Sequence, residues 1–257
     1  MREDAHISLP DGRSLAATTS LPDKPPPVGG WPAVVVLHEA FGVAPDILAA
    51  ADRFADNGWA AVVPNLFSRG TGIACLARAM RELATGEPGQ ITADIDATRA
   101  WLAARDDVDG QRLGVIGFCM GGGFALAYAA TAPPGVRAAS VNYGMVPKDE
   151  KALRRTCPVV ASYGDRDLPM RSHATRLRQH LAALGIEHDV AVHAGAGHAF
   201  MTEGHHPIAR LALFPLRIGY VQPAAEDTWE RTFAFFDRHI AGESPQTGSA
   251  TRTTTPS

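Results

Sequence analysis

Short, almost wholly apolar runs alternate along the chain with segments in which apolar residues recur every three or four positions. Apolar runs of this kind predict strands covered on both faces, and the helical spacing predicts amphipathic helices. The expected strands are residues 33–37, 59–63, 113–116, 138–142, 158–163 and 188–193, and the expected helices are residues 45–57, 73–84, 92–104, 172–184 and 226–240, with a further helix after Gly121. Strands and helices that alternate in this way predict an α/β fold with a mostly parallel, doubly wound sheet.

The two ends of the chain differ from this pattern. Residues 6–9 and 14–20 flank the sequence Pro-Asp-Gly at 10–12, which is typical of a tight turn, and they predict an antiparallel hairpin at the N-terminus. Residues 243–257 lack core-forming side chains, so we expect a disordered C-terminal tail. We expect residues 1–242 to form one domain, because α/β folds of this length are commonly single domains.

The stretch RLGVIGFCMGGGFALAY, residues 112–128, contains a nucleophile pattern in which Cys119 stands between Gly117 and Gly121. A nucleophile at a tight turn from strand to helix has a strained backbone, and its neighbours two residues away must lack bulk. The following helix would place unpaired N–H groups and the positive end of its dipole beside the sulfur, which favours a thiolate. A buried structural cysteine in a glycine-rich turn is the alternative interpretation.

Two further candidates follow strands, and active sites of doubly wound sheets lie at the carboxyl ends of the strands. Asp167 comes after one predicted strand in the sequence GDRD, and His198 comes after the last one in AGAGHAF. The chain order of nucleophile, acid and base is that of α/β-hydrolases, so we predict a triad of Cys119, Asp167 and His198. Asp165 is the alternative acid. Considered singly, Asp167 is typical of a turn or helix cap, and His198 of a structural histidine.

Glu39 directly follows the apolar strand at residues 33–37. Burial of a carboxylate at that place lowers stability unless the group has a partner or a catalytic role. We expect this strand end to lie beside the turn that holds Cys119. The N–H groups of Ala40 and Met120 are placed to form an oxyanion hole, which binds the negative oxygen of an acyl-transfer intermediate. A salt bridge that anchors the loop is the alternative role of Glu39.

Composition excludes several other classes of function. The formal charge of −3, from 24 basic and 27 acidic side chains, gives no electrostatic case for binding nucleic acid. The three cysteines include no C-x-x-C pair, which argues against a disulfide framework and favours a reducing compartment. Neither a signal peptide nor an apolar run long enough to span a membrane is visible, so we expect a cytoplasmic protein. His205 and His206 lack further ligands at zinc spacing, and we expect no metal and no other cofactor.

Four motifs together resemble the dienelactone hydrolase family, the carboxymethylenebutenolidases of the α/β-hydrolase fold. They are HEAFG at 38–42, GFCMGG at 117–122, YGDRD at 163–167 and GAGHAF at 195–200. The resemblance implies that Cys119 is the nucleophile, that His198 is the base and that Asp167 orients it. It also implies that Glu39 holds the resting thiol and accepts its proton when substrate arrives. A small ester or lactone would then be hydrolysed through a thioester acyl-enzyme, by a monomer or a weak homodimer.

One position departs from the family pattern. Well-studied members have an arginine four residues after the catalytic histidine, where it binds the substrate carboxylate, but this chain has Thr202 there. The resemblance places a second substrate-binding arginine in the segment after residue 64. Arg78 is the first choice by spacing, with Arg69 and Arg81 in the same segment. Further along the chain, Arg210 and Arg217 are possible substitutes for the missing arginine.

Two alternative functions stay open beside hydrolysis of small lactones or esters. A general carboxylesterase or thioesterase would use the same residues with an apolar pocket. A redox-sensing thiol protein without turnover would also need an exposed, reactive Cys119. Against the sensor, neither Cys75 nor Cys157 is an obvious resolving partner, and a sensor would not need Asp167 and His198 in register.

Overall fold

The computed structural model describes residues 1–68, 73–204 and 217–242. The strands in these ranges are β1 Arg2–Ser8, β2 Ser14–Ser20, β3 Trp31–Leu37, β4 Ala60–Pro64, β5 Val108–Phe118, β6 Val136–Asn142, β7 Val159–Gly164 and β8 His188–His193. The helices are α1 Pro45–Asp56, α2 Ile73–Thr85, α3 Gln90–Ala103, α4 Met120–Ala129, α5 Arg171–Ala183 and α7 Gln222–Phe236, with a 3-10 turn η1 at Glu150–Leu153 and a π-helical turn η3 at Asp237–Ala241.

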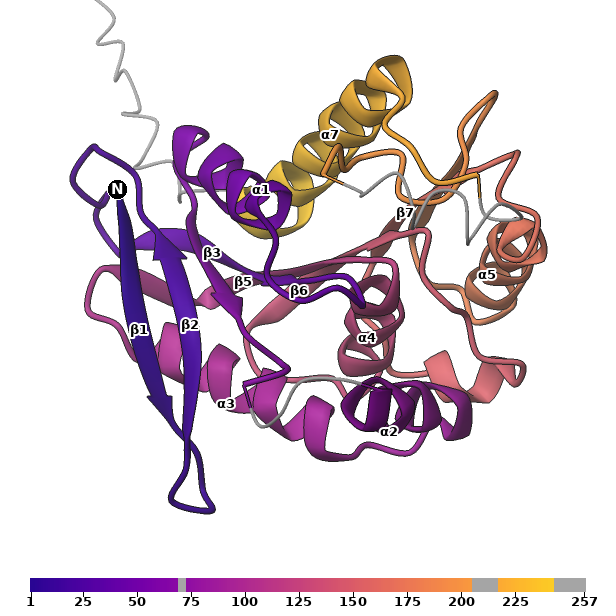
Figure 1. Cartoon of the computed structure of the whole chain (residues 1–257). Helices are drawn as coiled ribbons and strands as arrows, with labels where there is room; N and C mark the ends of the chain where they lie inside the picture. The colour runs from indigo at the N-terminus through magenta and orange to yellow at the C-terminus, as the bar shows by residue number, and fades with distance from the viewer. Residues whose placement is uncertain (69–72, 205–216, 243–257) are drawn as a thin grey trace, which may run out of the picture.

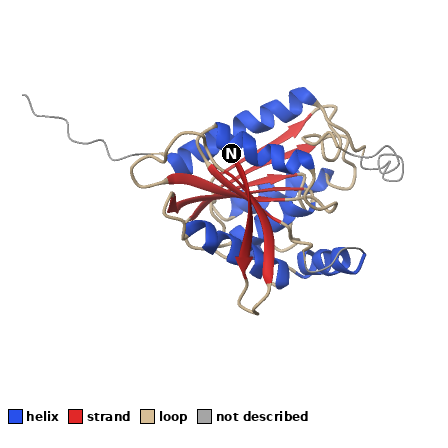
Figure 2. Cartoon of the chain, turned by 60° about the vertical axis from the view of Figure 1, so that its left-hand side comes forward, coloured by secondary structure: helices blue, strands red, loops and turns tan. Residues whose placement is uncertain are grey.

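One sheet contains all the described strands, in the order β1-β2-β4-β3-β5-β6-β7-β8 (Figure 1). Neighbours from β4 to β8 are parallel, whereas β1 and β2 run antiparallel to theirs. Helices cover both faces, with α1 and α7 on one face and α3 and α4 on the other (Figures 1 and 2). The predicted fold class, a mostly parallel doubly wound sheet with an N-terminal antiparallel hairpin, is confirmed.

The central strand β3 shows why the sequence folds in this way. All seven of its residues are buried. Val35 and Leu37 pack in the core formed with α3 and α4, while Val34 and Val36 pack in the core formed with α1 and α7. A strand buried on both faces needs apolar side chains at every position rather than at alternate ones. The uninterrupted run at 33–37 is the sequence signature of that burial.

The structure extends several strands beyond their predicted bounds, and the extension is greatest in β1 and β5. β1 begins at Arg2, and in this edge strand only Ile7 is fully buried, so its polar residues carry no alternating pattern. β5 begins at Val108, which pairs with Trp31 before a register shift in the ladder. The final helix also starts earlier than expected, at Gln222, with a proline in its first turn, where the missing N–H is tolerated.

Three further expectations concern the C-terminal tail, the number of domains and membrane spans. The predicted tail, residues 243–257, lies outside the described residues. The single domain at 1–242 stays a prediction. Among the helices of the described ranges, none has the length and apolar character needed to cross a membrane.

Candidate active site

Cys119 occupies the turn between β5 and α4, with φ 55° and ψ −116°. A positive φ is strained for a residue other than glycine and is typical of functional sites. A Cβ atom on Gly117 would lie 2.0 Å from the carbonyl oxygen of Gly121, and one on Gly121 would lie 2.3 Å from the carbonyl oxygen of Leu37. Only glycine therefore lets the turn close against α4 and lets the start of α4 pack against the end of β3. The side chain of Cys119 stays partly exposed.

His198 and Asp167 are in direct contact. The ring Nδ1 of His198 lies 2.6 Å from Oδ2 of Asp167, and both residues are buried. The loop after β8 can approach the end of β7 because Gly164 has no side chain. A Cβ atom at this position would lie 2.3 Å from the carbonyl oxygen of Ala196. Asp165, the alternative acid, is exposed and accepts the N–H of Gly195 at 2.8 Å. The structure thus places Asp167 rather than Asp165 against the imidazole.

The same imidazole interacts with Cys119. Burial lowers the pKa of His198, but the charge of Cys119 and hydrogen bonds to Asp167 and Cys119 outweigh burial and raise it to about 10. A cationic ring between a carboxylate and a sulfur can pair with a thiolate and later give its proton to a leaving group. The three residues predicted from separate strand ends therefore meet at one place.

Glu39 lies at the end of β3 with only 5% of its surface exposed. Its Oε1 accepts hydrogen bonds from the Thr202 hydroxyl at 3.2 Å and the Tyr143 hydroxyl at 3.4 Å. Burial raises the pKa of Glu39 to about 7, although the charge of His198 and the two hydroxyl groups lower it in part. A carboxyl with a pKa in this range can take up and release a proton near neutral pH.

Tyr143 was missed by the sequence reasoning. It follows β6 with φ 42° and is fully buried, and its ring centroid lies 5.1 Å from that of His198 in an edge-to-face arrangement. Its N–H donates to the carbonyl of Ser162 at 2.7 Å, which fixes the backbone. The sequence shows only that an aromatic residue directly follows a buried strand. This position does not predict that the Tyr143 hydroxyl reaches Glu39 at the end of β3.

His38, the first residue of the HEAFG motif, is a second residue whose contacts the sequence did not predict. Burial lowers its pKa to about 4, so the ring is neutral. Its Nδ1 lies 2.7 Å from the carbonyl oxygen of Glu39, and its Nε2 accepts the N–H of Leu66 at 3.1 Å. Because Nε2 accepts, Nδ1 carries the proton and donates a hydrogen bond to the backbone carbonyl of Glu39. His38 thereby fixes the backbone at the candidate carboxylate.

Two backbone N–H groups fit the predicted oxyanion hole. Met120 is the first residue of α4, so its N–H has no acceptor in the preceding turn, and it lies at the positive end of the helix dipole. Within the described part of the chain, neither this N–H nor that of Ala40 donates a hydrogen bond to the protein. Both groups are available to an oxygen that becomes negative during reaction.

The predicted arginine anchors have different outcomes. Arg69 and Arg210 lie outside the described residues. Arg78 is exposed on α2, and Arg217 is exposed beside the His198 loop, where its carbonyl oxygen faces Gly197. Thr202 is buried and places a hydroxyl, not a cation, on Glu39. Among the described histidine, cysteine and acidic residues, no group of three could hold a metal ion, and His205 and His206 are not described.

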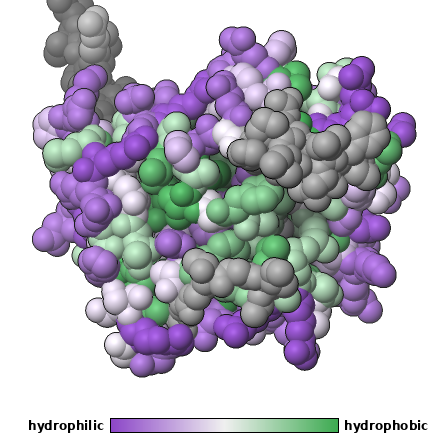
Figure 3. All heavy atoms as spheres, viewed as in Figure 1, coloured by the Kyte–Doolittle hydropathy of each residue, from purple (hydrophilic) through white to green (hydrophobic). Residues whose placement is uncertain are grey.

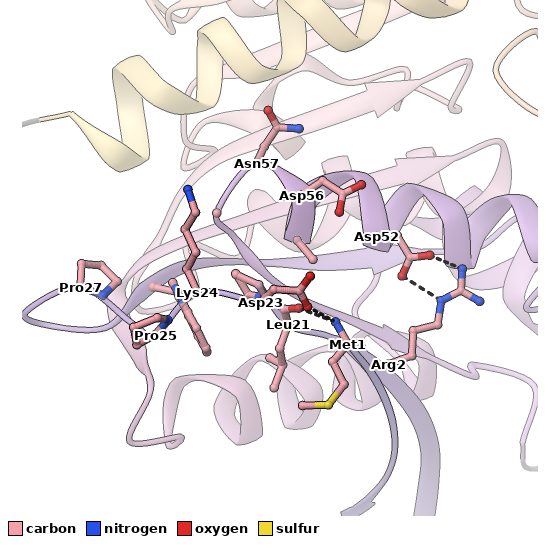
Figure 4. Close-up of a pocket in the computed structure, with 14 residues that line it drawn as sticks. Met1, Arg2, Leu21, Asp23, Lys24, Pro25, Pro27, Asp52, Asp56 and Asn57 are labelled. Atoms are coloured by element: carbon pink, nitrogen blue, oxygen red, sulfur yellow. Dashed lines mark hydrogen bonds and ion pairs between the residues drawn. The ribbon is translucent and has the colours of Figure 1, made fainter.

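Exposed apolar side chains lie next to two of the candidate site residues in the sequence. Apolar side chains gather near the middle of the face in Figure 3. Phe41, which follows Ala40, is 59% exposed, and Leu168, which follows Asp167, is 61% exposed. A separate cavity of about 880 Å³ lies between the start of β1 and the end of α1 (Figure 4), and none of the predicted site residues lines it. Arg2 and Asp52 at its wall bind each other.

Comparison with known proteins agrees with the motifs. The family model described as "Dienelactone hydrolase family" matches residues 15–240. A "Putative carboxymethylenebutenolidase" of Salmonella typhimurium is 30% identical, over 91% of this chain and 91% of that protein. The "Carboxymethylenebutenolidase" of Rhodococcus opacus is 29% identical, over 92% of this chain and 93% of that protein. The crystal structure of a "Putative Dienelactone Hydrolase" from Klebsiella pneumoniae aligns with a TM-score of 0.72 and 29% identity, over 93% of this chain and 100% of that one.

Proposed function

The chain belongs to the dienelactone hydrolase family, and from this premise we propose that it hydrolyses small esters or lactones with Cys119 as the nucleophile. The observation that carries the proposal is the position of His198, which is 2.6 Å from Asp167 and hydrogen bonded to Cys119. That arrangement supplies a base, an orienting acid and a sulfur nucleophile in one line of contacts.

Acylation starts from the Cys119 thiol, the Glu39 carboxylate and the His198 imidazolium. Glu39 accepts the thiol proton, and the resulting thiolate attacks the carbonyl carbon of the substrate. A carbon–sulfur bond forms, and the carbonyl electrons move to oxygen, which accepts hydrogen bonds from the N–H groups of Ala40 and Met120. When the carbon–oxygen bond breaks, the leaving alkoxide takes a proton from His198. The products are an alcohol, a thioester and a neutral imidazole.

Deacylation uses the neutral imidazole that acylation leaves behind. His198 removes a proton from water, and the hydroxide attacks the thioester carbonyl. The carbon–sulfur bond then breaks, which releases a carboxylic acid and leaves a thiolate beside the imidazolium. Glu39 returns its proton to the sulfur, and the starting state is restored. Asp167 keeps Nε2 of His198 directed to the reacting groups in both halves of the cycle.

Hydrolysis of p-nitrophenyl acetate by four proteins tests the proposal. Cys119→Ala and His198→Ala should each lower kcat/KM by at least about a thousandfold, because each removes a group that acts on the reacting atoms. Cys157→Ala is the matched control, since burial raises the pKa of that thiol to about 12 and it lies outside the proposed machinery. Cys119→Ala activity within about tenfold of wild type would refute the proposal.

The same set of variants separates a hydrolase from a redox-sensing thiol. A hydrolase shows saturable turnover of wild type that is lost in both active-site variants. A wild type that reacts rapidly with iodoacetamide at Cys119 but hydrolyses neither the ester nor a panel of lactones would overturn the hydrolase assignment and favour the sensor.

A further inference from the structure

The single hydroxyl group of Thr202 contacts two acceptors, and it also forms a hydrogen bond with the side chain of Tyr143. Its Oγ1 lies 3.2 Å from Oε1 of Glu39 and 3.2 Å from the carbonyl oxygen of Ala199. A hydroxyl has one proton to donate and lone pairs that accept. The Ala199 carbonyl can only accept, whereas a carboxyl group accepts when ionised and donates when protonated.

These contacts satisfy Glu39 in either protonation state. When Glu39 is ionised, Thr202 donates to Oε1, because a hydrogen bond to a charged acceptor is the stronger choice. When Oε1 carries a proton, Glu39 donates to Oγ1, and Thr202 turns its own proton to the carbonyl of Ala199. A buried polar group left without a partner is costly, and this arrangement avoids that cost throughout the proton transfer.

Tyr143 contributes a second, fixed donor to the same oxygen. Its hydroxyl lies 3.4 Å from Oε1 of Glu39, and the residue is fully buried. Burial, together with the nearby charges of Glu39 and Cys119, raises the pKa of Tyr143 well above its usual value, so it keeps its proton. Tyr143 therefore donates to Glu39 in both states and does not compete for the thiol proton.

We infer that Thr202 is a positioning residue that reverses its hydrogen bond to keep Glu39 satisfied as the carboxyl gains and loses a proton, with Tyr143 holding the same oxygen. The inference rests on the proposed role of Glu39 as the acceptor of the Cys119 proton. It gives the residue at the family's arginine position a different task in this chain.

Besides Thr202 and Tyr143, the charged and titratable groups near Glu39 also affect the pKa of its carboxyl group. The charge of His198 lowers the pKa of Glu39, and the charge of Asp46 on α1 raises it. His38 is neutral and binds the carbonyl of Glu39 rather than its carboxyl group. A change at Thr202 leaves these three groups in place, so its effect on the titration can be assigned to the hydroxyl and its hydrogen bonds with Glu39 and Tyr143.

The pH dependence of Cys119 alkylation by iodoacetamide tests the inference without requiring turnover. The adduct at Cys119 is quantified by peptide mass spectrometry on the full chain, so that Cys75 and Cys157 do not contribute. Wild type should show an inflection near neutral pH that Glu39→Gln abolishes. Thr202→Val should move this inflection upward by about half to one pH unit, because the hydrogen bond that the ionised carboxylate loses is stronger than the neutral one that the protonated carboxyl loses. Tyr143→Phe should move it in the same direction.

Two comparisons separate a hydrogen-bonding role from a packing role. Thr202→Ser keeps the hydroxyl and should leave the inflection within about 0.2 unit of wild type. In a Glu39→Gln background, Thr202→Val should leave the alkylation profile unchanged. Thr202→Ala replaces Thr202→Val if that variant does not fold.

Four outcomes would overturn the inference. They are a wild-type profile without an inflection that depends on Glu39, a Thr202→Val profile identical to wild type, an equal shift in Thr202→Ser, and an undiminished shift in the Glu39→Gln background. If the shift occurs as expected but wild type hydrolyses no ester or lactone, the proposed function fails while the role of Thr202 stands.

Discussion

The imidazole of His198 and the carboxylate of Asp167 form a buried pair, with Nδ1 and Oδ2 2.6 Å apart. Asp167 is fully buried, and its second oxygen, Oδ1, has no hydrogen-bond partner among the described residues. A buried carboxylate with so few partners is stable only beside a cation or a donor. The contact therefore both orients the ring and favours its protonated form, which is the state from which the proposed acylation starts.

Asp167→Asn should lower kcat/KM for p-nitrophenyl acetate by roughly 10²–10⁴, because an amide can hold the imidazole in the wrong tautomer and cannot offset its charge. Asp165→Asn is the matched control in the same loop, since an amide oxygen can still accept the N–H of Gly195. Its kcat/KM should stay within about threefold of wild type. Equal losses in the two variants would show that the loop, and not the Asp167 carboxylate, is responsible.

Glu39→Gln should lower activity and stabilise the fold at neutral and higher pH. Because burial raises the pKa of Glu39 from 4.5 to about 7, the stability that goes with its protonated form is fully present below pH 4.5 and is lost as the pH rises to about 7. The free energy of unfolding of Glu39→Gln should therefore exceed that of wild type by up to about 3 kcal/mol at pH 8, with a smaller difference at pH 5.

Urea unfolding at pH 5 and pH 8 measures this difference. Glu203→Gln removes an exposed carboxylate, and its difference from wild type should be the same at both pH values. A Glu39→Gln variant whose stability relative to wild type does not depend on pH would contradict the burial of an ionisable carboxyl at this position. Unchanged rates of hydrolysis would remove Glu39 from the mechanism.

Gly117→Ala should destabilise the fold, because the new methyl group would lie 2.0 Å from the carbonyl oxygen of Gly121. The expected loss in free energy of unfolding is at least about 2 kcal/mol. Gly123→Ala, in the same helix, is the control, since its methyl group would meet the flexible end of Leu83 at 3.2 Å. Its stability should lie within about 1 kcal/mol of wild type. Similar stabilities of the two variants in urea would show that the turn does not need glycine at 117.

Substrate charge should matter because Thr202 places a hydroxyl where well-studied members of the family have an arginine. We expect p-nitrophenyl butyrate to have a kcat/KM roughly tenfold or more above that of mono-p-nitrophenyl succinate, since the succinate carboxylate loses hydration at the site without gaining a charged partner. Equal or higher kcat/KM for the succinate ester would point to a cation elsewhere. Arg78→Ala would then show whether α2 supplies it.

Much of the fold could be read from the sequence because each central strand is buried on both faces and each ends in a polar or glycine-rich turn. That regularity located Glu39, Cys119, Asp167 and His198 at strand ends, and parallel topology brings such ends to one edge of the sheet. The edge strand β1 was predicted too short, because only Ile7 of its seven residues is fully buried and no pattern marks the rest.

The contacts around Glu39 could not be predicted from the sequence. Tyr143 lies 104 positions further along the chain and Thr202 lies 163 positions further, and no local pattern links a hydroxyl to a distant carboxylate. Thr202 was noticed only as a missing arginine. Its proposed role depends on the distances from Oγ1 to Glu39 and to the carbonyl of Ala199, which are properties of the folded loop. The neutral state of His38 could not be predicted either, because it follows from complete burial in the folded chain.

Acid-quenched mass spectrometry of the enzyme during hydrolysis of p-nitrophenyl butyrate tests the central claim most directly. A thioester intermediate predicts a butyryl group on the peptide that contains Cys119, present at a steady-state level in wild type and absent in Cys119→Ala. The adduct should disappear on treatment with neutral hydroxylamine, which cleaves thioesters. Turnover with no acyl group at Cys119, or with the acyl group on another residue, would contradict cysteine as the nucleophile.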